Sequence, residues 1–185
     1  MKDLLSAINS ITLVSMETQK AIKDKIQFKS IKRKGILLKH GFTEDNLYFV
    51  RKGLLRGYII QKRKDITTWF SQEGDFVTSI YSFISRKPTQ ESIEALEDCE
   101  LDYVSYSDLN ELYSSHMELN LLGRVITEKY LIDLEERVNS FQFQSAKSRY
   151  QYFIEKHPDL FSRVKLGHIA SFLGITKETL SRIRS

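Results

Sequence analysis

The segment from Leu166 to Ile183, LGHIASFLGITKETLSRI, constrains the fold of this chain more than any other feature. Gly174 stands between two short helical patterns, and glycine adopts the left-handed backbone of a tight turn without a Cβ clash. Four residues earlier, Ala170 is small enough to let a second helix approach. The segment therefore predicts a helix-turn-helix, two short helices that cross at a steep angle.

The apolar residues of this segment recur with a helical period. We expect them to pack between the two helices and the rest of the domain, with Thr176 as the N-cap of the second helix. The residues expected to hold the motif together are Ile169, Ala170, Leu173, Gly174, Ile175, Leu180 and Ile183.

The second predicted helix keeps one polar face, formed by Lys177, Glu178, Ser181 and Arg182. Arginine pairs with guanine and glutamate accepts from cytosine, so these residue types read base edges in a major groove. We expect double-stranded DNA as the partner, contacted by Thr176, Lys177, Glu178, Ser181, Arg182 and Arg184. The alternative is a short solvated helix with a Glu178–Arg182 ion pair.

Charge is distributed unevenly along the chain, whose formal net charge is +4. Residues 145–185 carry eight Lys or Arg and three Asp or Glu, which gives +5 there and leaves −1 for the rest. A basic module on a near-neutral body suits attraction of phosphate by one end of the molecule.

Composition indicates a protein that stays in the cytoplasm. The chain has 185 residues and 41% hydrophobic content, enough for a buried core. We find no apolar run near the ~20 residues of a membrane span and no signal-peptide pattern. Cys99 is the one cysteine, which excludes an internal disulfide framework.

Residues 26–105, which follow a first helical stretch, alternate at period two in short runs separated by glycines and charged pairs. This pattern predicts an antiparallel barrel or jelly roll of about eight strands. The runs are IQFKSIK, GILLKHG, NLYFVRKG, LLRGYIIQ, ITTWFS, ESIEAL and CELDYVS.

From about Ser107 the period becomes helical, and residues 107–138 contain no proline. We expect a long helix with one side on the barrel and the other on a twin helix, the alternative being a helix that lies entirely on its own barrel. Its expected dimer residues are Leu119, Leu122, Val125, Ile126 and Ile132. A further helical run, Ser145–Glu155, ends before Pro158.

The predicted order is an α+β chain with a β-roll sensor domain at 1–106, a dimerisation helix at 107–140 and a helix-turn-helix domain at 141–185. In this order, the chain resembles the cyclic-AMP receptor protein/FNR (Crp/Fnr) family of bacterial transcription regulators, in a divergent form common in Bacteroidetes. The matching segments are LYFVRKGLLRGY (47–58), TTWF (67–70), EGDFV (73–77), IEALEDCEL (93–101) and IASFLGITKETLSRIR (169–184).

The resemblance implies a homodimeric regulator that reads a two-fold symmetric DNA site, with RNA polymerase as a further partner. Many members of the family continue into a β-hairpin wing behind the second helix. Here the sequence stops at Ser185, so we expect a helix-turn-helix domain of the winged-helix type without its wing, and therefore fewer phosphate contacts.

The expected effector site departs from the cyclic-AMP-binding pattern of the family. Val77-Thr78-Ser79-Ile80 replaces the Gly-Glu pair that holds the ribose, and Thr89-Gln90-Glu91-Ser92 replaces the Arg-Ser pair that clamps the cyclic phosphate. A buried phosphate without a guanidinium lacks charge-assisted hydrogen bonds. We therefore predict no binding of cyclic AMP in the usual way. Arg86 and Lys87 are interpreted as solvated turn residues before Pro88, the alternative being a site for another anion.

Other effectors and cofactors are not indicated by the sequence. An iron-sulfur centre of the family type needs four cysteines, and the histidines form no arrangement typical of haem or metal ligation. A small apolar effector in the roll remains open, with Phe76, Thr78, Ser79, Tyr81, Thr89 and Gln90 as candidate residues. The aromatic residues of the roll are also typical of an ordinary core.

An enzyme is not expected. Cupin-type jelly rolls bind catalytic metals through clustered histidines, but only His40 lies in the strand region, and no nucleophile or phosphate-loop motif occurs. The remaining alternative is a small-molecule-sensing or protein-interaction module whose helix-turn-helix contacts a protein instead of DNA.

Overall fold

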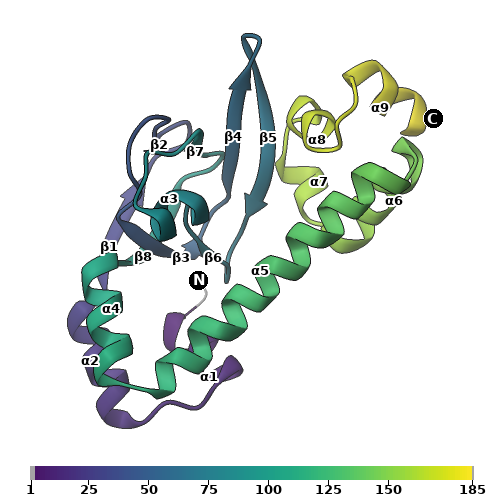
Figure 1. Ribbon diagram of the computed structural model, residues 1–185. Helices are drawn as coiled ribbons and strands as arrows, with labels where there is room; N and C mark the ends of the chain where they lie inside the picture. Colours follow the sequence, from purple (N-terminus) through teal and green to yellow (C-terminus); the bar gives the residue numbers. More distant parts are fainter. Residues whose placement is uncertain (1–2, 185) are drawn as a thin grey trace. The chain divides into compact units, whose positions relative to one another are not determined.

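The computed structural model describes residues 3–184 (Figure 1). By contacts between Cα atoms, the chain divides into two compact units. The first comprises the described residues up to Gly57 together with Phe70–Glu128, and the second comprises Tyr58–Trp69 together with the described residues from Lys129 onward. This grouping cuts across the three-part division expected from the sequence, because part of a β-hairpin joins the C-terminal helices.

Two capped helices begin the first unit. Helix α1 (Leu4–Ile11) starts after Asp3, whose carboxylate accepts from the N–H of Ser6. Helix α2 (Met16–Lys25) starts after Ser15, whose hydroxyl accepts from the N–H of Thr18. Each cap binds a backbone donor that a helix leaves without an intrahelical partner.

Eight strands follow, arranged as two four-stranded sheets in the orders β1-β8-β3-β6 and β2-β7-β4-β5. The predicted jelly roll of about eight strands is confirmed. Strand β6 and helix α3 were not predicted, because β6 has two residues and α3 has six, too few to show a period. The bounds are β1 Gln27–Ile31, β2 Ile36–Leu38, β3 Asn46–Lys52, β4 Leu55–Gln61, β5 Lys64–Ser71, β6 Phe76–Val77, α3 Ile80–Ser85, β7 Glu91–Ala95 and β8 Cys99–Ser105.

Strand β8 lies between β1 and β3 and pairs antiparallel with both. Tyr103 on β8 is opposite Gln27 on one side and Tyr48 on the other, and the two tyrosine rings lie 5.8 Å apart between centroids. Near this sheet, apolar residues of α1, α2, α4 and α5 join Phe49 and Val104 in one buried cluster. The core of the first unit therefore includes helices from both ends of the strand region.

The long helix predicted over 107–140 is interrupted, and this prediction was wrong in that respect. Helix α4 (Tyr106–Ser115) ends at His116, and α5 (Glu118–Phe143) begins two residues later. The interruption lies against the start of α2: Thr18 Oγ1 is 3.0 Å from His116 Nδ1, and Glu118 Oε1 accepts from the N–H and hydroxyl of Ser15. These tertiary bonds fix a break that the apolar period does not signal.

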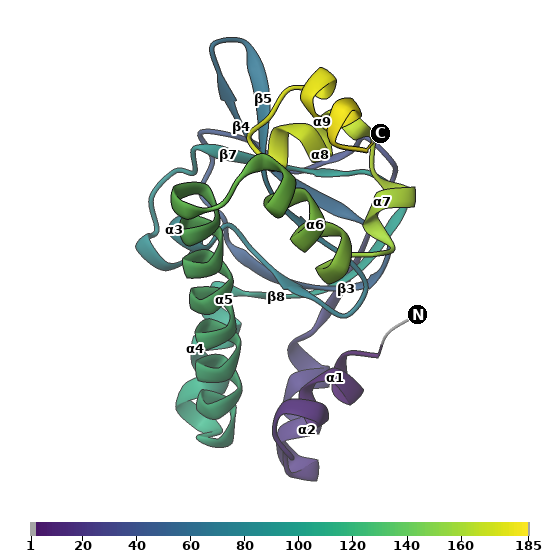
Figure 2. The same ribbon diagram turned by 90° about the vertical axis from the view of Figure 1, so that its right-hand side faces the viewer.

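Four helices follow α5 in the second unit (Figure 2). Helix α6 (Ala146–Lys156) is capped by Ser145 and ends before Pro158, as predicted. The short helix α7 (Leu160–Arg163) then leads to α8 (Leu166–Phe172) and α9 (Lys177–Arg184). Lys156 joins α6 to α5 through Asp133 at 2.9 Å and Glu136 at 2.7 Å. Within residues 3–184, no helix is long and apolar enough to cross a membrane.

Candidate nucleic-acid interface and effector site

The turn between α8 and α9 has the geometry that the sequence predicts for Gly174. This residue has φ +66°, and the N–H of Ile175 donates to the carbonyl of Ala170 at 2.9 Å. Thr176 caps α9, because its hydroxyl accepts from the N–H of Thr179 at 3.2 Å. The predicted N-cap is therefore confirmed.

The apolar residues of the two helices face inward, as their spacing predicts. Leu180 of α9 is 1% exposed, and its neighbours on and after α8, Ile169, Ala170 and Leu173, are between 0% and 3% exposed. Ile175 and Ile183 are half-buried. Burial of this face fixes which side of α9 remains available to a partner.

Glu178, Ser181 and Arg182 lie exposed on that available side of α9. The Glu178–Arg182 ion pair of the alternative interpretation does not form; Arg182 Nη2 instead donates to Thr179 Oγ1 at 3.4 Å. The Glu178 carboxyl has a lowered pKa, mainly because it accepts a hydrogen bond from its own backbone N–H at the start of α9. A hydrogen bond with the Thr176 side chain lowers this pKa further. Glu178 therefore stays an anionic acceptor at neutral pH.

Two of the six candidate DNA contacts also pack on neighbouring elements. The Lys177 side chain crosses α8 so closely that a Cβ on Gly167 would lie 2.5 Å from Lys177 Cε. The Arg184 guanidinium lies 4.9 Å from the centre of the Phe161 ring of α7. Their charges remain at the surface, but their stems hold α9 in place.

Helix α8 is fixed by two arginines that the sequence did not single out. Arg137 of α5 donates to the carbonyls of Thr67 and Phe172, both at 3.4 Å, and its guanidinium lies 4.3 Å from the Phe172 ring centre. Arg149 of α6 donates to the carbonyl of Leu173 at 3.0 Å. Burial lowers the pKa of Arg137 to about 10, so it remains charged at neutral pH. No spacing rule identifies such contacts, since their partners are backbone carbonyls distant in sequence.

Residues on α5 expected to face a partner chain divide into two groups. Leu119 and Leu122 belong to the buried cluster of their own unit, so the prediction that these two face a second chain is corrected, whereas Ile126 is half-buried against the same cluster. Val125 is half-buried, and Ile132 is 57% exposed. The apolar side chains that α5 leaves exposed are Leu121, Tyr130, Leu131, Ile132, Leu134, Val138, Phe141 and Phe143.

Four of the six candidate effector residues around α3 contact other side chains or the backbone of the roll. Thr78 Oγ1 donates to the carbonyl of Asn46 at 2.8 Å, and the hydroxyls of Ser79 and Thr89 lie 2.9 Å apart. Phe76 packs on Phe49 with the rings tilted by 54° and their centroids 5.2 Å apart. Tyr81 and Gln90 point to solvent as exposed residues. The structure thus brings Ser79 and Thr89 together but not the whole set.

Arg86 is not a solvated turn residue, which corrects the sequence interpretation. It ends α3 with φ +58°, and its guanidinium donates to the carbonyls of Glu44 at 2.8 Å and Phe83 at 3.1 Å. It also pairs with Asp45 and lies 4.1 Å from the centre of the Tyr106 ring. Through these contacts the Arg86 guanidinium holds the end of α3 against Glu44, Asp45 and Tyr106. Lys87 is exposed.

Glu44 is a buried acid beside this arginine network. Its Oε1 accepts from the N–H of Asn46 at 2.9 Å, while its Oε2 is buried without a hydrogen-bond partner among residues 3–184. Burial raises the pKa of the Glu44 carboxyl to about 7. In the same unit, the buried Arg56 binds Glu94 through Nη2 at 2.8 Å.

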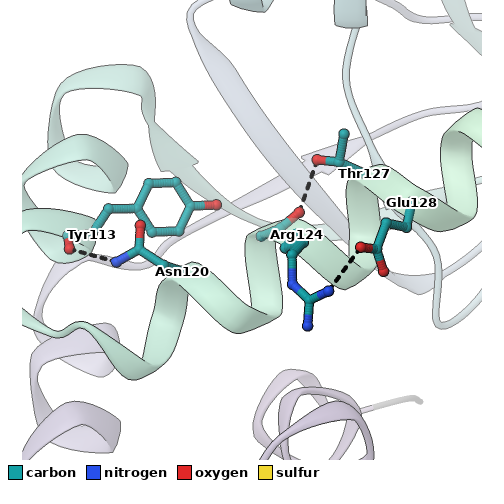
Figure 3. A pocket seen from close by; sticks show the side chains of 6 residues that line it. Tyr113, Asn120, Arg124, Thr127 and Glu128 are labelled. Carbon is teal, nitrogen blue, oxygen red and sulfur yellow. Dashed lines mark hydrogen bonds and ion pairs between the residues drawn. The ribbon is translucent and has the colours of Figure 1, made fainter.

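A groove with a volume of about 340 Å³ lies between α4 and α5 (Figure 3). The Tyr113 ring covers Gly123, where a Cβ would lie 2.6 Å from the tyrosine oxygen. Asn120 donates to the carbonyl of Tyr113 at 3.0 Å, and Arg124 pairs with Glu128 at 2.9 Å. None of the six residues that line it, including Thr127, was a predicted effector contact.

The histidines serve separate roles. His116 bonds to Thr18, His157 lies 5.6 Å from the Phe153 ring, and His40 is exposed. Among residues 3–184, no three His, Cys, Asp or Glu side chains are grouped as metal ligands.

Residues 28–116 match the model of the cyclic nucleotide-binding domain family. No curated protein matches the sequence. Solved structures show the same fold over most of this chain. A CooA mutant from Carboxydothermus hydrogenoformans superposes with a TM-score of 0.75 at 19% sequence identity, and the match covers 99% of this chain and 83% of the CooA chain.

Two further structures share the fold. The c-di-GMP-responsive global regulator CLP of Xanthomonas campestris has a TM-score of 0.71 at 19% identity, over 91% of this chain and 89% of its own. A transcriptional regulator from Eubacterium rectale, assigned to the Crp/Fnr family, has a TM-score of 0.72 at 18% identity. The match covers 92% of this chain and 82% of the regulator. The chain therefore combines a cyclic nucleotide-binding domain fold with the helical arrangement found in such regulators.

Proposed function

We propose that this chain, which has the fold of Crp/Fnr-type regulators, is a sequence-specific DNA-binding transcription regulator that works as a homodimer. The observation that carries the proposal is the state of α9: Leu180 is buried, while Glu178, Ser181 and Arg182 are exposed on the opposite face. A capped helix with this polar face, preceded by a tight turn, suits insertion into a major groove.

Dimerisation through α5 follows from its apolar surface. Leu131, Leu134 and Val138 recur at spacings of three and four, the pattern of a coiled-coil seam, and are 60%, 43% and 45% exposed. A row of large apolar side chains on one helix is unfavourable in water and is covered by a second copy of the same helix. The two α9 helices would then read half-sites about 34 Å apart, one turn of DNA.

Cyclic AMP is not the effector in this proposal. The nearby guanidinium of Arg86 already bonds to Glu44, Phe83 and Asp45, and the buried Arg56 is paired with Glu94. A cyclic phosphate in the roll would find both of these guanidiniums already paired, and burial of an anion without a guanidinium partner is costly. Calorimetry with cyclic AMP should give no heat of binding; stoichiometric binding at low micromolar concentration would refute this part.

Selection of duplexes from a random DNA pool by the purified protein tests the function. We expect enrichment of a palindrome with half-sites about one helical turn apart, bound more weakly as salt rises because counterions are released on binding. Failure to enrich any sequence, together with a salt-insensitive complex with a protein partner, would favour the protein-interaction alternative.

A further inference from the structure

The hairpin formed by β4 and β5 ends in a strained, cationic tip. Lys62 and Arg63 form its two-residue turn with φ +48° and +65°, and Lys64 begins β5. Positive φ at both central residues is typical of a type I′ turn, in which glycine is favoured because it has no Cβ to clash with the backbone, and asparagine because its side chain forms local hydrogen bonds. The chain thus keeps two long cationic side chains at positions where other residues would be more stable.

The three cations at the tip are free to bind a partner. Residues 60–65 are exposed, and none of Lys62, Arg63 and Lys64 has an ion-pair partner in the part of the chain that the structure describes. Three adjacent positive charges on a narrow projection attract a polyanion more strongly than the same charges dispersed over a surface.

The hairpin is fixed to the helix that precedes the candidate recognition helix. The N–H of Thr67 on β5 donates to Ser171 Oγ of α8 at 2.7 Å, and Arg137 bridges the carbonyls of Thr67 and Phe172. Residues 58–69 belong to the same compact unit as α8 and α9, and the hairpin lies alongside α8 in both ribbon views (Figures 1 and 2).

The length of the hairpin beyond this anchor matches the dimensions of DNA. Arg63 is four positions before Thr67, and a strand rises about 3.3 Å per residue, so the tip lies about 13 Å along the strand from the anchor. The major groove is about 12 Å wide. The distance from the anchor to the tip is thus comparable with the width of the groove whose bordering phosphates the tip would contact.

We propose that Lys62, Arg63 and Lys64 bind the DNA backbone beside the half-site that α9 reads, so that a hairpin of the β-roll adds phosphate contacts to those of the recognition helix. This inference rests on the proposed DNA-binding function. It also predicts that the sensor domain affects DNA affinity directly, since β4 continues into the roll.

The first test compares two triple variants on the duplex selected by the wild-type protein. The tip variant loses its three charges through Lys62→Gln, Arg63→Gln and Lys64→Gln. The control variant loses three exposed charges of the other compact unit through Arg33→Gln, Lys34→Gln and Lys39→Gln. Lys34 is a matched position because it also has positive φ. Each phosphate contact contributes about 0.9 to the slope of log Kd against log salt. We expect the tip variant to lower the slope by about two to three and the control by less than one. Equal slopes for the two variants would overturn the inference.

The second test locates the tip on the DNA. Cys99 is 2% exposed, and burial raises the pKa of its thiol to about 11, so Arg63→Cys introduces the one reactive thiol for a DNA-cleaving iron chelate. We expect cuts clustered beside each half-site, and none from the matched Lys34→Cys protein. If Arg63→Cys binds the duplex but gives no cuts, the tip contact is rejected and DNA binding by α9 is retained. If the wild-type protein selects no duplex, both the tip contact and the proposed DNA-binding function are rejected.

Discussion

The Phe141 ring fills the space where a side chain on Gly174 would begin: its Cε1 atom lies 2.6 Å from the position of an added Cβ. Phe141 lies in the last turn of α5, and Gly174 forms the turn between α8 and α9. Arg137 and Arg149 flank the same ring at 5.0 and 5.2 Å from its centre. The turn is therefore packed against the end of the long helix, which sets the position of α8 and α9 relative to that end.

Replacement of Gly174 by alanine tests this contact. The φ of +66° strains any residue with a Cβ, and the clash with Phe141 adds to that strain. We expect Gly174→Ala to lower the free energy of unfolding by more than about 2 kcal/mol, measured by denaturant titration. Gly41→Ala is the matched control, because Gly41 has φ +87° with nothing within 4 Å. An equal loss in both variants would show that Phe141 does not restrict the turn.

Arg182→Ala tests base reading by α9. If Arg182 pairs with a guanine, its loss should cost about 1–3 kcal/mol on the selected duplex and abolish discrimination at one base pair of each half-site. Binding to duplexes altered at each position in turn measures this. Lys147→Ala removes an exposed charge from α6 and serves as control. Unchanged discrimination in Arg182→Ala would exclude a base contact.

Leu131→Glu tests the proposed dimer surface on α5. This side chain is 60% exposed and belongs to the row of Leu131, Leu134 and Val138, so the change costs little in an isolated chain but places a charge in a helix-helix seam. Sedimentation should show a 21.7 kDa monomer for the variant. Asn139→Glu, at an exposed polar position of the same helix outside that row, should remain dimeric. A dimeric Leu131→Glu protein would place the interface elsewhere.

The buried carboxyl of Glu44 should make the folded chain less stable as pH rises. Its carboxyl has a pKa of about 7 in the folded chain against an ordinary 4.5, so between these values the folded state keeps a proton that the unfolded state has released. Below pH 4.5 the contribution is complete, and it falls by up to about 3 kcal/mol as pH rises through 7.

Glu44→Gln cannot ionise, so its free energy of unfolding should decline less than that of the wild type between pH 4.5 and 7. Urea titrations at several pH values measure the difference. Glu17→Gln, which alters an exposed acid on α2, is the control and should follow the wild type. Parallel curves for all three proteins would contradict a buried carboxyl that titrates near neutrality.

Local patterns predicted the elements that depend on local chemistry. Gly174, Thr176 and Leu180 signal a turn, a cap and a buried face within one short segment, and the structure has all three. Period-two runs likewise predicted the strands of the roll. Such features need only the preferences of neighbouring residues.

Contacts between distant segments were not predicted. The break at His116 depends on hydrogen bonds from Ser15 and Thr18, about a hundred residues earlier, and a helical period cannot reveal it. Arg86 and Arg137 look like solvated cations in sequence, but each binds backbone carbonyls and aromatic rings. A carbonyl acceptor is present at every residue, so sequence alone does not mark the one that is used.

The most direct test of a dimeric DNA reader is a change in half-site spacing. The selected palindrome is compared with a duplex in which about five base pairs, half a helical turn, are inserted between unchanged half-sites. The insertion places the two half-sites on opposite faces of the DNA, where two α9 helices held by one α5 pair cannot bind both. The affinity should therefore fall at least tenfold, which is about 1.4 kcal/mol or more. Equal affinity for the two duplexes would contradict the account.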